Sequence, residues 1–285
     1  MTLAAGWTAP TTGMFTRYNS ERANAEVDTV SSKNFTSLHQ RVTFSSALKA
    51  PRRALGVVVH WLSRQEALVL VSALVIVLAL LIFAKLTGEM LEGDTRDFDV
   101  WLLRALRRPD VPEIPVGPPW LRQAALDITV LGGPTFLTIA TFLTCGYLAF
   151  DRKYAAMWLV ALASGTGGLL STLMKHLFAR ERPDVVPHLA IATSPSFPSG
   201  HSMLAAVIYL TLGALLARFA TRGRTRAYVV SVALLLTFLV GSSRVYLGVH
   251  YPTDVLAGWV AGLGWALLCW LVARYLQRRG AIDTS

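Results

Sequence analysis

The sequence predicts an all-α, polytopic membrane protein built as a six-transmembrane-helix bundle. Of its 285 residues, 53% are hydrophobic and only 15% are charged, whereas a soluble domain averages about 25% charged residues. The chain also contains six apolar runs separated by polar connections. The net charge of +10 is concentrated beside these runs. It therefore indicates membrane topology, and we expect the lipid bilayer as a partner and no nucleic acid.

The chain is expected to begin with a polar tail. Residues 1–53 are rich in Gly, Thr, Ser and Asn and contain no apolar run in the first 30 positions. This composition predicts a disordered cytoplasmic tail without a cleaved signal peptide. Residues 54–285 are then expected to form the six-span domain, in which the short apolar segment 54–62 lies on the membrane surface.

The predicted spans are apolar runs that can cross most or all of a hydrocarbon core about 30 Å thick. They cover residues 67–86, 126–150, 155–174, 203–216, 227–241 and 255–272. The sequence Gly132-Gly133-Pro134 interrupts the second run and predicts a kink there. Small residues at Gly258 and Gly262 in the sixth span, and three glycines in the third, favour close packing of those two spans.

The first outer loop, residues 87–123, contains a predicted interfacial helix. Phe98, Trp101, Leu102 and Ala105 share one helical face, which is typical of an amphipathic helix lying on a membrane. Pro109 is expected to end that helix, and the Pro-rich segment after it is not expected to be helical. This segment is either a plain connector or a flap beside the path that a lipid takes to the site.

The distribution of cations predicts the orientation. The connections on the side of the two termini together hold 17 Lys and Arg residues. The first loop on the other side holds five Arg against seven Asp and Glu between residues 89 and 122. The positive-inside rule therefore places the termini in the cytoplasm of a cytoplasmic (inner) membrane protein.

Three charged clusters between residues 175 and 254 carry the predicted chemistry, and this orientation places all three on the outer face. They read Lys175-His-Leu-Phe-Ala-Arg-Glu-Arg182-Pro183, Pro198-Ser199-Gly200-His201 and Ser243-Arg244-Val-Tyr-Leu-Gly-Val-His250-Tyr-Pro-Thr-Asp254. Three cations without a comparable acidic cluster suit a phosphoryl group, since Arg offers a planar fork and Lys a point charge. Ser199 and Gly200 precede an apolar run, so backbone N–H groups at a helix start can face the same anion.

Two histidines complete this set. His titrates near neutral pH, so His201 and His250 can divide the roles of acid and of nucleophile or base. Asp254 follows His250 by four residues, within reach of its ring, and can fix the tautomer of the imidazole.

The three clusters match, in order and spacing, the K-x6-RP, PSGH and SR-x5-H-x3-D signature. In this the chain resembles the type 2 phosphatidic acid phosphatase (PAP2) superfamily, in particular its branch of bacterial membrane lipid phosphatases. The resemblance implies that His250 is the nucleophile that becomes phosphohistidine, that Asp254 orients it, and that His201 protonates the leaving group and then activates water. It further implies a set of phosphate-binding residues, and no cofactor or catalytic metal. That set is Lys175, Arg182, Ser199, Gly200 and Arg244.

The resemblance implies a membrane enzyme that hydrolyses a phosphomonoester or pyrophosphate of a lipid, with its site facing the periplasm or exterior. The lipid is of the phosphatidic acid, phosphatidylglycerophosphate or undecaprenyl pyrophosphate type. Two alternatives stay open, namely a lipid phosphotransferase on the same scaffold and a non-catalytic carrier of lipid phosphates. Arg180 and Glu181 lie outside the signature, and we expect them to pair with each other or to line the access route. The oligomeric state is not indicated.

Overall fold

A computed structural model describes residues 66–279 of the chain. This part is helical, without strands, and contains only one isolated β-bridge, between Arg107 and Pro115. Its elements are the helix Glu66–Glu92, α2 (Arg96–Ala105), α3 (Pro119–Leu131), α4 (Pro134–Phe150), α5 (Tyr154–Phe178), α6 (Gly200–Phe219), α7 (Gly223–Tyr246) and α8 (Pro252–Arg278). The expected tail at 1–53 and the surface segment at 54–62 lie outside the described residues.

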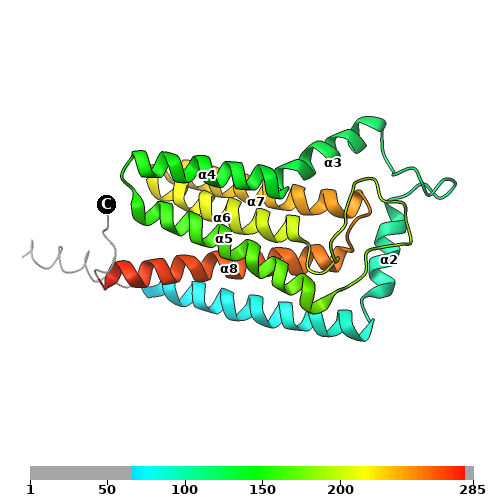
Figure 1. The fold of residues 1–285 in the computed structure, drawn as a ribbon, viewed down its shortest axis with the longest axis horizontal. Coiled ribbons are helices and arrows are strands. Elements are labelled where there is room, and N and C mark those ends of the chain that lie inside the picture. The colour runs from blue at the N-terminus through cyan, green and yellow to red at the C-terminus, as the bar shows by residue number, and fades with distance from the viewer. Residues whose placement is uncertain (1–65, 280–285) are drawn as a thin grey trace, which may run out of the picture. The chain divides into compact units, whose positions relative to one another are not determined.

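The six-span prediction is confirmed at the level of helix number and type. Five described helices are long and apolar enough to cross a membrane, and α3 with α4, bent by 47°, makes six if the pair is counted as one span. The bend falls at the predicted Gly-Gly-Pro sequence, where Gly133 is extended and Pro134 opens α4 without needing a backbone N–H partner. In Figure 1, α3 turns away from the end of α4.

The start of this second span was predicted wrongly. The helical part begins at Pro119 rather than at residue 126, because the polar pair Arg122 and Gln123 interrupts the apolar run that a hydropathy argument follows. Gln123 donates to Asp127 over a distance of 2.9 Å, one helical turn later, so two polar side chains satisfy each other on the exposed face of α3.

Helix α6 is the centre of the bundle. It packs against α5, α7 and α8, and α4 also reaches it. Figure 1 shows α4 to α8 running side by side, with α2 lying across one end. Among the described spans, α6 is the most enclosed and Glu66–Glu92 is the least.

Helices α5 and α8 pack against each other as predicted, but the nearest contacts of the α8 glycines are with another helix. A Cβ atom on Gly258 would lie 2.7 Å from the carbonyl oxygen of Ser199, and one on Gly262 would lie 2.6 Å from Cβ of Ala206. Both contacts are with the PSGH loop and α6 rather than with α5. Because side chains are missing at these points, the backbones of α6 and α8 approach closely.

Helix α2 is the predicted interfacial helix, and it ends at Ala105, before Pro109. Phe98 and Trp101 are exposed on it, whereas Leu103 is fully buried against Val186 and Val255. The Pro-rich segment after α2 is not helical until Pro119 begins α3. One face of α2 is thus fixed to the end of the bundle, and the other presents aromatic side chains outward.

Candidate active site

The three charged clusters meet at the end of the bundle that α2 crosses. The backbone N–H of Ser199 donates to the carbonyl of Asp254 over 3.0 Å, which joins the second cluster directly to the third. The backbone N–H of Leu189 donates to the carbonyl of Leu247 over 3.0 Å, which ties the α5–α6 loop to the α7–α8 turn. Residues far apart in the sequence are therefore fixed to one another by main-chain hydrogen bonds.

His250 lies in the α7–α8 turn and is 1% exposed. Its Nδ1 lies 3.3 Å from Oδ2 of Asp254, and its Nε2 lies 3.3 Å from a guanidinium nitrogen of Arg182. A guanidinium only donates hydrogen bonds, so Nε2 is the accepting nitrogen and Nδ1 carries the proton toward Asp254. This tautomer leaves the Nε2 lone pair as the reactive electron pair of the ring.

Asp254 is fully buried in the first turn of α8. Its Oδ2 also accepts from the backbone N–H of Tyr251 over 2.9 Å and from the hydroxyl of Ser196. Its Oδ1 accepts from Arg180 over 2.6 Å. A carboxylate with this many donors has one orientation, so the imidazole beside it is held in one orientation as well.

Two of the three cations share one tether in the α5–α6 loop. Nζ of Lys175 donates to Oγ of Ser194 over 2.9 Å and to the carbonyl of Pro195 over 2.7 Å. Nε of Arg182 donates to the carbonyl of Ser194 over 2.7 Å. The loop therefore holds two like charges beside each other, an arrangement that a dense anion stabilises.

The third cation, Arg244 in α7, is almost fully buried. One of its terminal nitrogens donates to the hydroxyl of Thr129 in α3 over 2.9 Å. Its Nε is buried without a hydrogen-bond partner among the described residues. A buried charged donor without a partner is costly unless a ligand completes it.

The PSGH sequence forms the start of α6. Ser199 is the N-cap, and its hydroxyl oxygen accepts from the backbone N–H of Ser202 over 3.4 Å. A Cβ atom on Gly200 would lie 3.2 Å from Cε of Lys175, so this glycine lets the helix start approach the cation. A Cβ atom on Gly133, at the α3–α4 bend, would lie 3.9 Å from Nε2 of His201.

Charge and burial act on the two histidines together. Burial and the positive charges of Arg244, Lys175 and Arg182 all act on the ring of His201. Burial lowers the pKa of His250 to about 4, and the nearby Asp254 opposes this effect without overcoming it. Burial also lowers the pKa of Arg182. At neutral pH the imidazole of His250 is therefore neutral.

Several polar residues of this region were missed or misjudged from the sequence. The expected pairing of Arg180 with Glu181 is wrong, because Arg180 forms ion pairs with Asp99 of α2 and with Asp254. Ser196 is fully buried beside His250. A signal for Asp99 existed, since it precedes the buried Leu103 by one helical turn on the same face of α2.

Ser243, a signature residue, donates to the carbonyl of Val240 in its own helix over 2.7 Å. Within residues 66–279, no three His, Cys, Asp or Glu side chains come together as metal ligands would.

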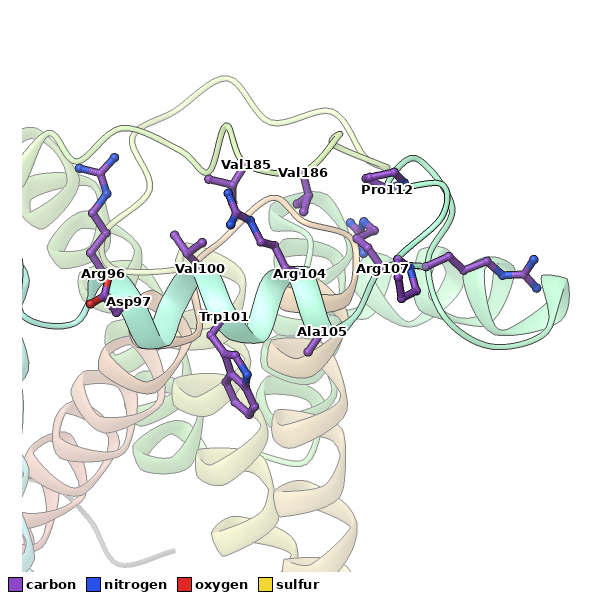
Figure 2. A pocket seen from close by; sticks show the side chains of 12 residues that line it. Arg96, Asp97, Val100, Trp101, Arg104, Ala105, Arg107, Pro112, Val185 and Val186 are labelled. Atoms are coloured by element: carbon purple, nitrogen blue, oxygen red, sulfur yellow. The ribbon is translucent and has the colours of Figure 1, made fainter.

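A large cavity of the described part lies apart from the signature residues. It has a volume of about 960 Å³ and lies between α2 and the segment with Val185 and Val186, and none of the eight predicted site residues lines it. Figure 2 shows Arg104 on the side of α2 that faces Val185, while Trp101 points the opposite way. This cavity contains none of the residues predicted to act on phosphate, so the hydrogen-bonded cluster around His250 is the better candidate site.

Comparison with known proteins agrees with the signature. The model of the PAP2 superfamily matches residues 137–278, which include all three clusters. Phosphatidylglycerophosphatase B of Bacillus subtilis is 40% identical over 163 residues, covering 56% of this chain and 77% of the relative. Lipid A 1-phosphatase of Rhizobium etli is 39% identical over 108 residues, covering 34% of this chain and 41% of the relative.

A solved structure is also similar. The crystal structure of a transmembrane PAP2-type phosphatidylglycerolphosphate phosphatase from Bacillus subtilis superposes with a TM-score of 0.65 at 32% identity, covering 71% of this chain and 98% of that one. Fold, signature and site geometry therefore lead to the same conclusion. The chain belongs to the PAP2 superfamily, and it is a multi-pass membrane phosphatase.

Proposed function

We propose that the protein removes a phosphate from a membrane lipid of the phosphatidylglycerophosphate type, through a phosphohistidine at His250. The observation that carries the proposal is the environment of this ring. Its Nδ1 faces a buried carboxylate and its Nε2 faces Arg182. A neutral, oriented imidazole beside a cluster of cations is suited to attack phosphorus.

In the first step, the lone pair on Nε2 of His250 forms a bond to phosphorus while the bond from phosphorus to the lipid oxygen breaks. His201 donates a proton to that leaving oxygen. Lys175, Arg182 and Arg244 stabilise the charge on the other phosphate oxygens, together with the Ser199 hydroxyl and the Gly200 N–H at the start of α6. Asp254 keeps the remaining ring proton on Nδ1.

In the second step, water attacks the phosphorus of the phosphohistidine. His201, now neutral, accepts a proton from this water, and the bond between phosphorus and Nε2 breaks. Inorganic phosphate leaves, and both histidines return to their initial states. The proton that His201 gives to the leaving oxygen is replaced by one from water, and the three cations would neutralise the phosphate, so the proposal requires no metal.

Two observations support a lipid substrate. The site lies at the end of the helical bundle that α2 crosses, and α2 carries the exposed aromatic side chains of Phe98 and Trp101. A relative that matches over most of its length is named phosphatidylglycerophosphatase. The excess of cations on the side of the termini supports a site on the periplasmic or outer face of the cytoplasmic membrane.

The test is phosphate release from a panel of lipid phosphates by the purified protein in detergent, with EDTA present. We expect release by the wild type and by His176→Ala, a matched control because His176 is exposed and outside the signature. Release should disappear in His250→Ala. Activity that survives in His250→Ala would overturn the nucleophile, and label transferred to a second lipid without free phosphate would indicate a phosphotransferase.

A further inference from the structure

A buried ion-pair network links the outer helix α2 to the proposed nucleophile. Asp99 of α2 is fully buried, and its Oδ2 lies 2.9 Å from a terminal nitrogen of Arg180. The other terminal nitrogen of Arg180 lies 2.6 Å from Oδ1 of Asp254. Asp254 in turn faces Nδ1 of His250. Four side chains from three separate parts of the chain thus form one continuous series.

Asp99 is also fixed to the first turn of α8. The backbone N–H of Thr253 donates to Oδ1 of Asp99 over 3.0 Å, and the Thr253 hydroxyl donates to Oδ2 over 2.6 Å. The Arg180 guanidinium lies over the ring of Tyr251, 4.3 Å from its centroid. These contacts set both the position and the plane of the guanidinium fork.

The geometry divides the two oxygens of Asp254 between two partners. Arg180 takes Oδ1, while Oδ2 faces the imidazole of His250. An Arg fork with a single carboxylate partner tends to bind both of its oxygens. Asp99 prevents this, because it occupies the second terminal nitrogen of Arg180.

We propose that Asp99 is a positioning residue for His250, acting through Arg180, so that the interfacial helix α2 is a working part of the active site. This inference rests on the proposed function and extends it to residues outside the signature. Helix α2 also carries the exposed Phe98 and Trp101, which would contact the membrane. The same helix would therefore both contact the membrane and orient the nucleophile.

The network predicts opposite effects of its two outer members on His250. The charged groups around the ring are Asp254 from α8, Arg180 and Arg182 from the α5–α6 loop, Lys175 from α5 and Arg244 from α7, with His201 of α6 nearby. Asp99→Asn leaves Arg180 to neutralise Asp254 alone, which disfavours a charged imidazole. Arg180→Gln leaves Asp254 without that cation, which favours a charged imidazole.

The experiment measures kcat, KM and the acid limb of kcat/KM on the best lipid of the panel. We expect Asp99→Asn and Arg180→Gln each to lower kcat about 10- to 100-fold, as for other partners that orient a reacting His, with KM within about twofold. The acid limb should move to lower pH in Asp99→Asn and to higher pH in Arg180→Gln. In the double variant the limb should return toward the wild-type position, because the two lost charges cancel.

The matched control is Asp97→Asn, an exposed carboxylate on the same helix, which should leave kcat and the limb unchanged. Arg180→Lys should keep the limb near its wild-type position, since the charge remains, but recover only part of kcat. Shifts in the same direction for Asp99→Asn and Arg180→Gln, or an equal effect of Asp97→Asn, would overturn the proposal.

A second readout separates this inference from the proposed function. The ring nitrogens of His250, labelled with ¹⁵N and assigned through His250→Gln, can be titrated by NMR in detergent without any substrate. The opposite shifts of Asp99→Asn and Arg180→Gln should appear there as well. A wild type that releases no phosphate but shows these shifts would refute the proposed function and retain the network, whereas an unchanged titration would refute the network.

Discussion

The two halves of the site differ in how completely their polar groups are satisfied. Around His250, the carboxylate of Asp254 accepts hydrogen bonds from a side-chain hydroxyl, a backbone N–H and a guanidinium. On the opposite side, Arg244 has one polar partner, Thr129, and its Nε is buried without one among the described residues. The proposed nucleophile is therefore oriented by the protein itself, whereas the proposed phosphate-binding half has a buried donor that an anion would complete.

The largest effect expected from this difference is that of Asp254→Asn. An amide cannot hold the Nδ1–H tautomer as a carboxylate does, so the oriented half would lose its function. We expect kcat to fall by about 10³- to 10⁴-fold, comparable to the loss of the orienting Asp in serine proteases. Phosphate release measures it, with the exposed Asp127→Asn as control. A loss of less than tenfold would show that the nucleophile does not depend on this carboxylate.

Arg244→Lys tests the other half. Lys keeps the charge but loses the fork and the unpartnered Nε–H, so we expect kcat/KM to fall about 10²- to 10³-fold. Thermal stability in detergent should change little or rise, because a costly buried donor is removed. Strong destabilisation together with unchanged kcat/KM in the folded fraction would instead assign Arg244 to the structure of the bundle.

A smaller effect is expected from Gly132→Ala at the bend between α3 and α4. The new methyl group would overlap Cγ1 of Val240 and lie 3.4 Å from Cβ of His201. Overpacking of this kind costs about 1–3 kcal/mol, and the displaced His201 should lower kcat about tenfold. The control is Gly146→Ala in α4, where a Cβ atom meets nothing within 4 Å. Equal melting temperatures and rates for the two variants would contradict this account.

The smallest effect concerns pH. Since the pKa of His250 is lowered from 6.5 to about 4, its neutral form persists through mildly acidic pH. The neutral His250 ring therefore makes its full contribution to the free energy of unfolding above pH 6.5. This contribution is lost as the pH falls from 6.5 toward 4, because the unfolded chain binds the proton more readily. We expect the His250 limb of the kcat/KM profile well below pH 6.5, corrected for substrate ionisation. A His250 limb near 6.5 would indicate a solvated ring.

The sequence predicted which segments form helices better than it predicted which helices pack against each other. Helix number and type followed from apolar runs, and the kink followed from the chemistry of Gly and Pro at 132–134. The partner of the α8 glycines was wrong, because small residues indicate a close approach without saying which helix approaches. The predicted start of the second span was too late, because Arg122 and Gln123 lower the hydropathy of the first turns of α3.

The site shows the same limit. The spacing of the signature identified the residues that meet at one end of the bundle, and the i, i+4 relation placed Asp254 beside His250. Asp99, Arg180 and Ser196 could not be assigned in the same way, since their partners are distant in sequence. Asp99 and Arg180 are separated by 81 positions, and only the crossing of α2 over the bundle brings them together. The catalytic roles of the signature residues stay predictions until the variants are measured.

The absence of side chains at Gly258 and Gly262 allows α8 to approach α6 closely beside the site. Where these glycines lie, α8 runs so close to α6 that a Cβ on Gly258 would be 2.7 Å from the oxygen of Ser199. The approach of α6, which begins with Gly200 and His201, to α8, which carries Asp254, therefore depends on a helix contact inside the bundle as well as on the hydrogen bond from Ser199 to Asp254. A screen for variants that fold yet lose activity should consequently recover these two glycines, although neither would touch the phosphate.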